Sequence, residues 1–454
     1  MIARLLAEAP KLLLLAFPLV IGQLAHSGVS FADTVMVGRL GSLPLAGVAL
    51  GGSLYFFLFI LCSGVLYSVS PSISQAYGAG EPGAVQLAAR QGVWLALFMA
   101  LPVVALLNFS EPLLLLAGQD PEVAALAATY LRTISWGFLP MILTVALRGF
   151  LEGTGDTRPL MFILFCGLMV KILLNSVLLD GWGPFPALGV RGAALSSAFV
   201  YVTEFSVMAT YLTLKHRDLR LLQGLGRPHG PMLRELAGIG LPIGLTMGFE
   251  SGLFTVAAFV MGIFGSDQLA AHQLAISSAS MAFNIPMAVG LATSIRVGQN
   301  VGRLDRTTAG SASLTGVLLA MLFTMVTASV FAFLPRQVLG LYLDLGDPAN
   351  AGVIGFALVF LGFAAMFQLA DGIQVAASGA LRGYKDTTVP MYISMFSYWV
   401  AGLGTGLLLA FPLGMGSSGI WIGLVIGLSV AALLLSLRLA WRTRQPLKRR
   451  IVTG

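Results

Sequence analysis

Charged side chains are scarce in this sequence. Asp, Glu, Lys and Arg together make up 10% of its 454 residues, whereas hydrophobic residues make up 57%. A soluble domain carries roughly 25% charged residues. Because so few charges cannot cover a water-exposed surface, the composition excludes both a soluble globular chain and a disordered one. It predicts a polytopic membrane protein.

Cysteine and histidine are also rare, and the short motifs of common enzyme classes are absent. Cys62 and Cys166 both lie within apolar segments, which excludes a disulfide framework. The four histidines are scattered, and no P-loop, GxSxG, HExxH or CxxC motif occurs. The sequence therefore predicts a protein without a cofactor and offers no clustered catalytic set for a membrane-embedded enzyme.

Apolar stretches long enough to cross a bilayer recur along the chain. A spanning helix needs about 20 apolar residues, and turn residues such as Gly, Pro and Asp separate the stretches of that length. Twelve such stretches lie at 12–37, 45–69, 88–108, 123–148, 159–180, 188–214, 236–262, 269–295, 311–334, 350–377, 389–411 and 418–440.

The basic residues predict the orientation of these spans. The net charge is +7, but the basic residues lie in short loops between apolar runs, so no nucleic-acid partner is expected. Of the 26 Lys and Arg residues, 21 lie at the termini or in even-numbered loops and three lie in odd-numbered loops. Because basic loops stay in the cytoplasm, both termini are predicted to be cytoplasmic, with the chain in the cell membrane.

The chain also repeats itself. Shifted by 224 residues, its first half matches the second without gaps for some 60 positions, so that Pro18 meets Pro242 and Gly28 meets Gly252. Six spans per half give both halves the same orientation, which predicts a pseudo-two-fold axis along the membrane normal. The expected fold is all-α, with an N-lobe at 1–224 and a C-lobe at 225–454. Two such lobes rocking about a central cavity have the geometry of alternating access.

Two carboxylates interrupt the spans of the second half. Glu250 lies in the middle of the apolar segment 241–265, and Asp371 lies in the tenth span. A charge near the bilayer centre costs about 2.5–3.5 kcal/mol on insertion scales, so it usually marks an ion, proton or substrate path. Two carboxylates supply oxygen ligands for Na⁺, and they can also bind protons. Phe367, four residues before Asp371, is a candidate for stacking on a cation, and Gln368 lies beside it.

The first half holds a different set of candidates. Asp33 lies late in the first span, and Lys171 and Asn175 share a face of the fifth span at a spacing of four residues. Lys171 either pairs with Asp33 or extends its amine towards the membrane surface, and the sequence leaves both possibilities open. His26 is typical of hydrogen bonds between helices. His26 and Gln273 complete the candidate cavity residues.

Several stretches resemble hallmark motifs of the multidrug and toxic compound extrusion (MATE) family, and GFESG around Glu250 and QLADGIQ around Asp371 resemble its NorM-type branch. The stretches are ADTVMVGRLG at 32–41, LAAHQL at 269–274, ATSIRVGQNVG at 292–302 and LRGYKDTTVP at 381–390. The resemblance extends over essentially the whole chain. It implies twelve helices in two lobes and export of organic cations driven by inward Na⁺ or H⁺. The family's cation-binding acids correspond to Glu250, Asp371 and Asp33, and its fifth-helix asparagine corresponds to Asn175.

Two positions depart from the pattern that this resemblance implies. A tyrosine is usual where Phe367 stands, so one hydroxyl ligand is missing. A polar uncharged residue is more usual where Lys171 stands, and a fixed positive charge there can replace a bound cation. Both departures bear on which ion drives transport.

The leading hypothesis is therefore an antiporter that exports small organic cations against Na⁺ or H⁺, acting as a monomer in contact with membrane lipid. A lipid-linked saccharide flippase of the same superfamily is the alternative transport reading, and it predicts a strongly basic cavity. A membrane-embedded enzyme and a channel are weaker alternatives, because the chain has neither a catalytic cluster nor filter-like repeats.

Overall fold

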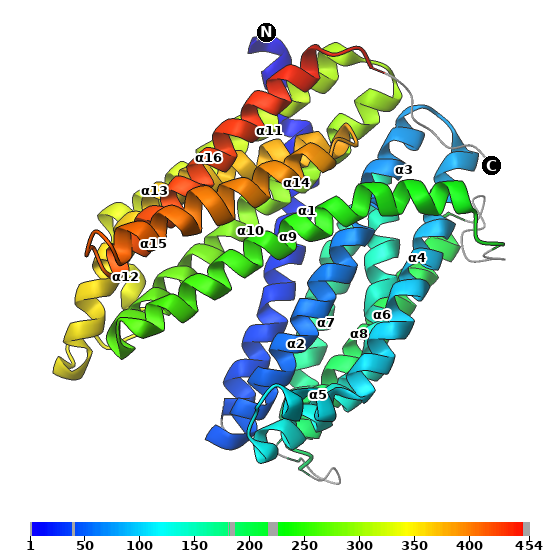
Figure 1. Cartoon of the computed structure of the whole chain (residues 1–454). Coiled ribbons are helices and arrows are strands. Elements are labelled where there is room, and N and C mark those ends of the chain that lie inside the picture. Colours follow the sequence, from blue (N-terminus) through cyan, green and yellow to red (C-terminus); the bar gives the residue numbers. More distant parts are fainter. Residues whose placement is uncertain (1, 39–40, 180, 182–186, 217–225, 448–454) are drawn as a thin grey trace. The chain divides into compact units, whose positions relative to one another are not determined.

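The computed structural model is all-α and describes residues 2–38, 41–179, 181, 187–216 and 226–447. In this part of the chain, twelve helical spans are long and apolar enough to cross a membrane, which confirms the predicted fold class (Figure 1). Helices α2 and α3 form one of these spans, and α14, η3 and α15 form another. The helices are α1 (Ile2–Gly38), α2 (Ser42–Leu66), α3 (Val69–Gly78), α4 (Pro82–Asn108), α5 (Ser110–Leu116), α6 (Pro121–Thr154), α7 (Arg158–Leu178), α8 (Val190–Lys215), α9 (Gly230–Ile263), α10 (Ser266–Gly302), α11 (Arg306–Phe333), α12 (Pro335–Leu339), η2 (Pro348–Asn350), α13 (Ala351–Gly383), α14 (Thr388–Met395), η3 (Phe396–Gly404), α15 (Thr405–Ala410) and α16 (Ser417–Arg444).

The backbone repeats between the two halves at the ends of helices. Left-handed conformations, which favour glycine, occur at positions that correspond under a shift of 224 or 230 residues. These pairs are Gly41 (φ 111°) with Gly265 (φ 125°), Gly80 (φ 73°) with Leu304 (φ 61°), and Gly155 (φ 86°) with Lys385 (φ 56°). The sequence repeat is therefore also a repeat of local structure.

The chain forms two compact units whose boundaries lie inside helices. Unit 1 comprises Met1–Val20 and Leu245–Arg449, and unit 2 contains Ile21–Gly244. The boundaries fall within α1 and α9, two residues after the corresponding prolines Pro18 and Pro242. The units therefore differ from the halves 1–224 and 225–454, since the start of α1 groups with the second half and the start of α9 with the first.

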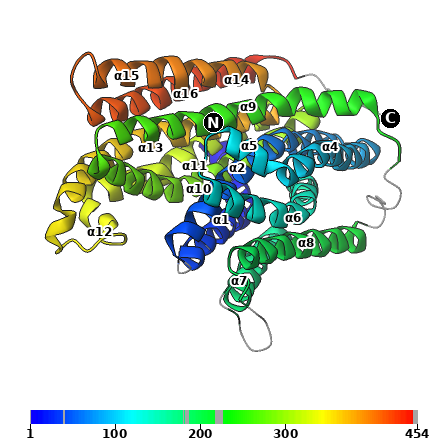
Figure 2. The same cartoon turned by 60° about the horizontal axis from the view of Figure 1, so that its bottom comes forward.

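Unit 2 is built around α6, which packs against α2, α3, α4, α5 and α8. Asp120 begins α6 by accepting a hydrogen bond from the Glu122 backbone N–H at 2.9 Å. Helix α7 packs against α8, which in turn packs against α6 (Figure 2). Gly22 and Gly28 let α1 approach Leu164 and Leu168 of α7 closely. These contacts place the second part of α1 beside α7.

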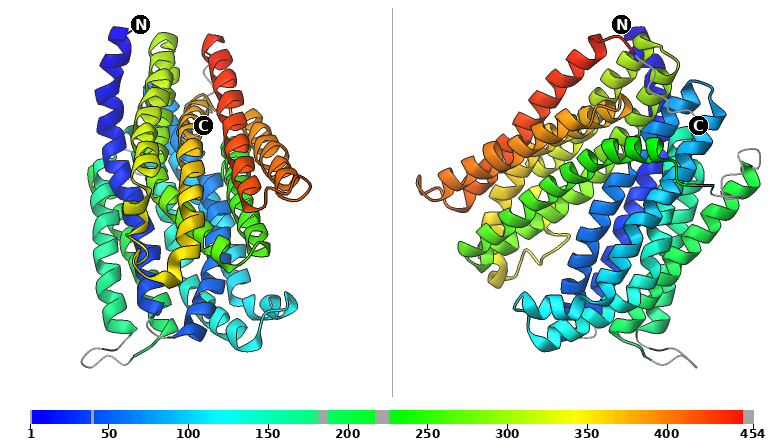
Figure 3. Two further views of the ribbon diagram at one scale, coloured as in Figure 1. Left: turned by 90° about the vertical axis from the view of Figure 1, so that its left-hand side faces the viewer. Right: turned by 45° about the vertical axis from the view of Figure 1, so that its right-hand side comes forward.

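Unit 1 is built around α13, which packs against α10, α11 and α16. Helix α16 also lies along α14, η3 and α15, as both views of Figure 3 show in red and orange. Trp421 of α16 and Phe360 of α13 are fully buried and stack at a centroid distance of 5.4 Å. Gly252 brings α9 against the Trp399 ring of η3. The apolar core of unit 1 therefore surrounds α13.

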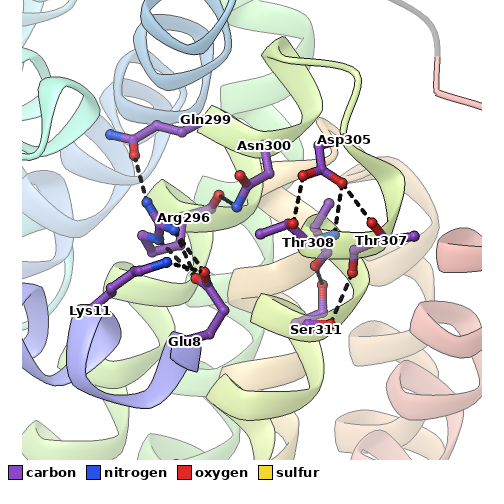
Figure 4. Close-up of polar contacts among 11 residues, drawn as sticks. Glu8, Lys11, Arg296, Gln299, Asn300, Asp305, Thr307, Thr308 and Ser311 are labelled. Atoms are coloured by element: carbon purple, nitrogen blue, oxygen red, sulfur yellow. Dashed lines mark hydrogen bonds and ion pairs between the residues drawn. The ribbon is translucent and has the colours of Figure 1, made fainter. Parts of the chain in front are cut away.

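An ion pair holds the first turns of α1 to α10 within unit 1. The buried carboxylate of Glu8 accepts two hydrogen bonds from Nη2 of Arg296, at 2.8 and 3.1 Å, and one from its Nε (Figure 4). Beyond the end of α10, Asp305 caps α11 by accepting the Thr308 N–H at 3.0 Å. Hydrogen bonds from Thr308 hold the pKa of the Asp305 carboxyl below its usual value.

Candidate functional site

Unit 1 brings two acids together from separate helices. Glu250 lies on α9 and is half-buried, and Asp371 lies on α13 with 5% of its surface exposed. The two carboxylates are close enough for their negative charges to repel each other, and Arg382 near the end of α13 attracts Glu250. We call Glu250 and Asp371 the carboxylate pair.

A short hydrogen-bond chain orients Asp371. Gln374, one turn further along α13, donates from Nε2 to Oδ1 of Asp371 at 3.1 Å. The Tyr398 hydroxyl then donates to Oε1 of Gln374 at 2.9 Å. Tyr398 is fully buried on η3, a stretch of wide helical turns of the kind that is frequent at functional sites. The sequence did not single out Tyr398. A tyrosine is common in apolar spans, and the sequence does not show that its hydroxyl faces Gln374 of α13.

The carboxylate pair is not neutralised by a direct ion pair. Within the described residues, no Lys or Arg forms a salt bridge with Glu250 or Asp371. No group of three His, Cys, Asp or Glu residues gathers there or elsewhere in this part of the chain. A Na⁺ ion held by the pair would therefore take its remaining oxygen ligands from amides, carbonyls or water.

The other candidates of unit 1 face elsewhere. The Phe367 ring is 2% exposed and lies 5.9 Å from the Trp421 ring, which gives it a packing contact in the core. Gln368 donates to the Ala279 carbonyl of α10 at 3.2 Å, so it joins two helices. Gln273 is exposed on α10. These positions stay predictions as substrate contacts, and the geometry described here does not join them to the carboxylate pair.

Unit 2 holds its acid in an ion pair. Lys171 is fully buried on α7, and its Nζ lies 2.7 Å from Oδ1 of Asp33 on α1. Asn175, one turn along α7, donates to the same Asp33 oxygen at 2.8 Å. Of the two possibilities left open for Lys171, the structure forms the pair with Asp33. The structure thus brings Asp33, Lys171 and Asn175 together, and their roles in cation coupling and substrate binding stay predictions.

Helix α8 contributes residues that the sequence analysis missed. The Lys171 ammonium donates to Oγ of Ser197 at 2.6 Å, to Oγ of Ser196 at 2.8 Å and to the Ala193 carbonyl at 3.0 Å. Ser197 also donates to Oδ2 of Asp33 at 3.4 Å, and Ser196 donates to the Asn175 side-chain oxygen. Two adjacent serines in the apolar run AALSSA are a weak indication of a polar site. We call Asp33, Asn175, Ala193, Ser196 and Ser197 the lysine cage.

Other ionisable residues of unit 2 form structural contacts. Arg148 donates to Glu152 at 2.6 Å and to the Gln23 side chain at 3.4 Å. Glu204 is buried against Gly167 of α7, where a Cβ would lie 2.2 Å from its Oε1. His26 lies 5.7 Å from the Phe59 ring. This contact packs His26 of α1 against α2.

The two units therefore offer different chemistry. Unit 1 presents two carboxylates that have no fixed cation in direct contact among the described residues, so a mobile cation can compensate their charge. In unit 2, the Asp33 carboxylate is already compensated by Lys171.

Comparison with known proteins gives the family. The MatE family model matches residues 18–177 and 242–408, one segment in each half. The chain is 40% identical over 442 residues to a probable multidrug resistance protein NorM of Deinococcus radiodurans, covering 96% of both chains. It is 38% identical to a protein of the same name from Rhizobium meliloti, covering 96% of this chain and 93% of that one.

Solved structures share the fold. A transporter of the MOP superfamily from Pyrococcus furiosus superposes with a TM-score of 0.87 at 22% identity, covering 98% of both chains. At this identity the likeness establishes the fold alone. The family match extends over most of the chain, and it agrees with the motifs at 32–41, 269–274, 292–302 and 381–390. The chain therefore belongs to the MatE family, the multidrug and toxic compound extrusion transporters, with NorM proteins among its relatives, and not to a family of enzymes.

Proposed function

We propose that the chain is a secondary active multidrug exporter that exchanges small organic cations for Na⁺ or H⁺. It would act in the cell membrane as a monomer with both termini in the cytoplasm, by alternating access of its two lobes. The names of the NorM relatives support multidrug resistance as the biological role.

The carboxylate pair is the observation that carries the proposal. Two negative charges inside an apolar helical unit are costly unless a positive charge compensates them. No basic side chain of the described part forms an ion pair with Glu250 or Asp371. A driving ion and a cationic drug can each supply this positive charge, and they would compete for the carboxylate pair. The pair can therefore hold one or the other at different stages of the cycle.

Competition alone does not produce transport. A gradient of one ion can drive another only if the two bind with opposite preference to the inward-facing and outward-facing states. Asp371 is held by the hydrogen-bond chain to Gln374 and Tyr398, and Tyr398 lies on the wide-turn segment η3. A change in α13 or η3 during the cycle would alter the orientation of Asp371, and hence which cation it favours.

The flippase alternative is less well supported, because the basic side chains of Lys171 and Arg148 inside unit 2 are already paired with acids. A lipid-linked saccharide carries phosphate, and a site for it needs positive charge that is not already compensated. In the described part of unit 2, Lys171 pairs with Asp33 and Arg148 pairs with Glu152. The buried Lys171 and the half-buried Arg148 are therefore neutralised within the chain.

Efflux of a fluorescent cationic dye from reconstituted vesicles tests the proposal. Each vesicle carries either a Na⁺ gradient or a pH gradient, so that the driving ion is identified directly. Glu250→Gln and Asp371→Asn should each reduce dye transport in the effective gradient by about tenfold or more, within the range of typical coupling energies. Glu122→Gln is the matched control, since Glu122 is exposed at the start of α6.

The control variant should transport at the wild-type rate. Normal transport by both Glu250→Gln and Asp371→Asn would show that the carboxylate pair is not the coupling site. Transport that needs neither gradient would contradict antiport.

A further inference from the structure

We propose that the ammonium of Lys171 occupies a monovalent-cation site built into unit 2, so that the chain itself fills a place that an alkali ion would otherwise take. The lysine cage supplies the ligands of this site. Removing the ammonium while keeping the cage should make unit 2 bind Na⁺.

The contacts of the ammonium are those of a coordinated ion. Four oxygen atoms surround Nζ at 2.6 to 3.0 Å: one carboxylate oxygen, two serine hydroxyls and one backbone carbonyl. An ammonium has only three N–H donors. Four oxygens at this distance therefore exceed what three directed hydrogen bonds can use, whereas a spherical ion can contact all four. Hard cations prefer this set of oxygen ligands.

Further hydrogen bonds hold the cage in shape. Asn175 donates to Asp33 while its own side-chain oxygen accepts from Ser196. Ser197 bridges to the second oxygen of Asp33 at 3.4 Å. The ligands on α1, α7 and α8 are thus linked to one another as well as to Lys171. Such links keep ligands oriented when the bound ion changes.

The charges of Lys171 and Asp33 balance within the cage. Lys171 is fully buried, and its single positive charge offsets the single negative charge of Asp33. Without the ammonium, the Asp33 carboxylate would be left uncompensated in a buried site, which is strongly unfavourable. The Asp33 side chain is 14% exposed, so the cage is not completely enclosed by the described residues. A monovalent cation restores the balance that Lys171 normally supplies.

The consequence for transport rests on the proposed function. If Lys171 fills the cage, unit 2 takes up no ion from solution, and all driving ions bind at the carboxylate pair of unit 1. Replacing Lys171 would then add one ion per cycle. The binding test itself does not depend on transport.

The test measures Na⁺ binding through thermal stability in a background that lacks the carboxylate pair. All proteins carry Glu250→Gln and Asp371→Asn, so sodium binding in unit 1 is removed. Three are compared in detergent: the background protein, the same protein with Lys171→Asn, and the protein with both Lys171→Asn and Asp33→Asn. NaCl replaces choline chloride from about 1 to about 100 mM at constant ionic strength. Ligand binding to the folded state raises the Tm with ligand concentration.

The Lys171→Asn protein should gain about 3 °C in Tm over this range of Na⁺. The background protein should gain nothing, because the ammonium fills the site, and the added Asp33→Asn should abolish the gain. A Tm that does not respond to Na⁺ in Lys171→Asn would overturn the proposal. So would a response that survives the loss of Asp33, or one that the background protein also shows.

Lys171→Gln keeps the proposal testable if Lys171→Asn does not fold. The measurement is then the recovery of monodisperse protein from membranes extracted in NaCl or in choline chloride. Recovery at least about twofold higher in NaCl supports the site, since bound Na⁺ shifts the folding equilibrium. Equal recovery in the two salts contradicts it.

Discussion

At the scale of single residues, the two units show two ways of keeping a carboxylate in an apolar environment. Asp33 has a permanent counter-ion in Lys171 at 2.7 Å. Among the described residues, Asp371 accepts a hydrogen bond from the neutral Gln374, which in turn accepts one from Tyr398, and it forms no salt bridge. Because an isolated buried charge is unfavourable, the second arrangement needs a mobile positive charge and the first does not. In the proposed mechanism, Asp33 is therefore a structural acid and Asp371 a coupling acid.

Backbone conformation at single residues gives a test of the internal repeat. Leu304 adopts a left-handed conformation, φ 61°, where the first half has Gly80. Leu304→Gly should stabilise the folded protein by about 1 kcal/mol, because the relieved strain exceeds the added entropy of the unfolded chain. Thermal or chemical unfolding in detergent measures this change.

Leu314→Gly is the matched control for Leu304→Gly. Leu314 is similarly exposed but lies inside α11, where glycine costs about 1 kcal/mol. The same chemical change should therefore have opposite signs at the two positions. A loss of stability at both would mean that Leu304 is not strained.

The sequence singles out charged candidates more readily than neutral ones. Glu250, Asp371 and Asp33 stand out because a charge in an apolar run is costly. Ser196, Ser197 and Tyr398 are ordinary in membrane helices, and only the packing of α8 against α7, and of η3 near α13, gives them partners. Phe367 was predicted to stack on a cation, but its contact with Trp421 depends on α16, which is distant in sequence.

At the scale of helices, glycines set how closely the central helices pack. On α13, a Cβ at Gly379 would lie 2.2 Å from the Gly290 carbonyl oxygen of α10. A shift of 230 residues places Gly379 opposite Gly149 of α6, where a Cβ would lie 3.0 Å from Val69 of α3. Both halves thus use small residues for close helix contact, as membrane proteins commonly do.

Gly379→Ala should destabilise unit 1. The atom it would meet belongs to a backbone, which cannot move aside as a flexible side chain can, so we expect a cost of about 1–3 kcal/mol. Gly362→Ala on the same helix is the control, because nothing lies within 4 Å of a Cβ there. That control should be neutral or slightly stabilising in unfolding measurements. Equal stability of both variants would contradict the close approach of α10 and α13.

Hydropathy predicted the spans but not their interruptions. The stretch 45–69 corresponds to α2, but the spanning helix continues as α3 to Gly78 after a break near Tyr67. The stretch 389–411 contains the wide-turn segment η3. Helices α5 and α12 escaped prediction, since five to seven residues are too few to show periodicity. The helix break, the wide turns and the short helices depend on local hydrogen bonding, which cannot be predicted from composition.

At the scale of the whole molecule, chain order and packing divide the protein differently. The repeat predicts halves at 1–224 and 225–454, whereas the compact units divide after Val20 in α1 and after Gly244 in α9. Glu8 and Arg296 fix the start of α1 within unit 1. Gly240 fixes the start of α9 within unit 2, because a Cβ there would overlap the Val65 carbonyl of α2. A sequence repeat identifies equivalent helices, but not which unit each part of a helix joins.

The central claim is that a cationic drug and the driving ion compete for the carboxylate pair. Equilibrium binding of a fluorescent organic cation to the purified protein tests it most directly, with Na⁺ varied at fixed pH and pH varied without Na⁺. Glu122→Gln serves as the control, and Glu250→Gln with Asp371→Asn removes the pair.

For the wild type and the control, we expect the apparent Kd of the dye to rise about tenfold as the driving ion increases. The variant without the pair should bind the dye weakly and independently of the ion. A wild-type affinity that is the same at all Na⁺ concentrations and all pH values would contradict the account. So would an equal dependence on the ion in the variant that lacks both carboxylates.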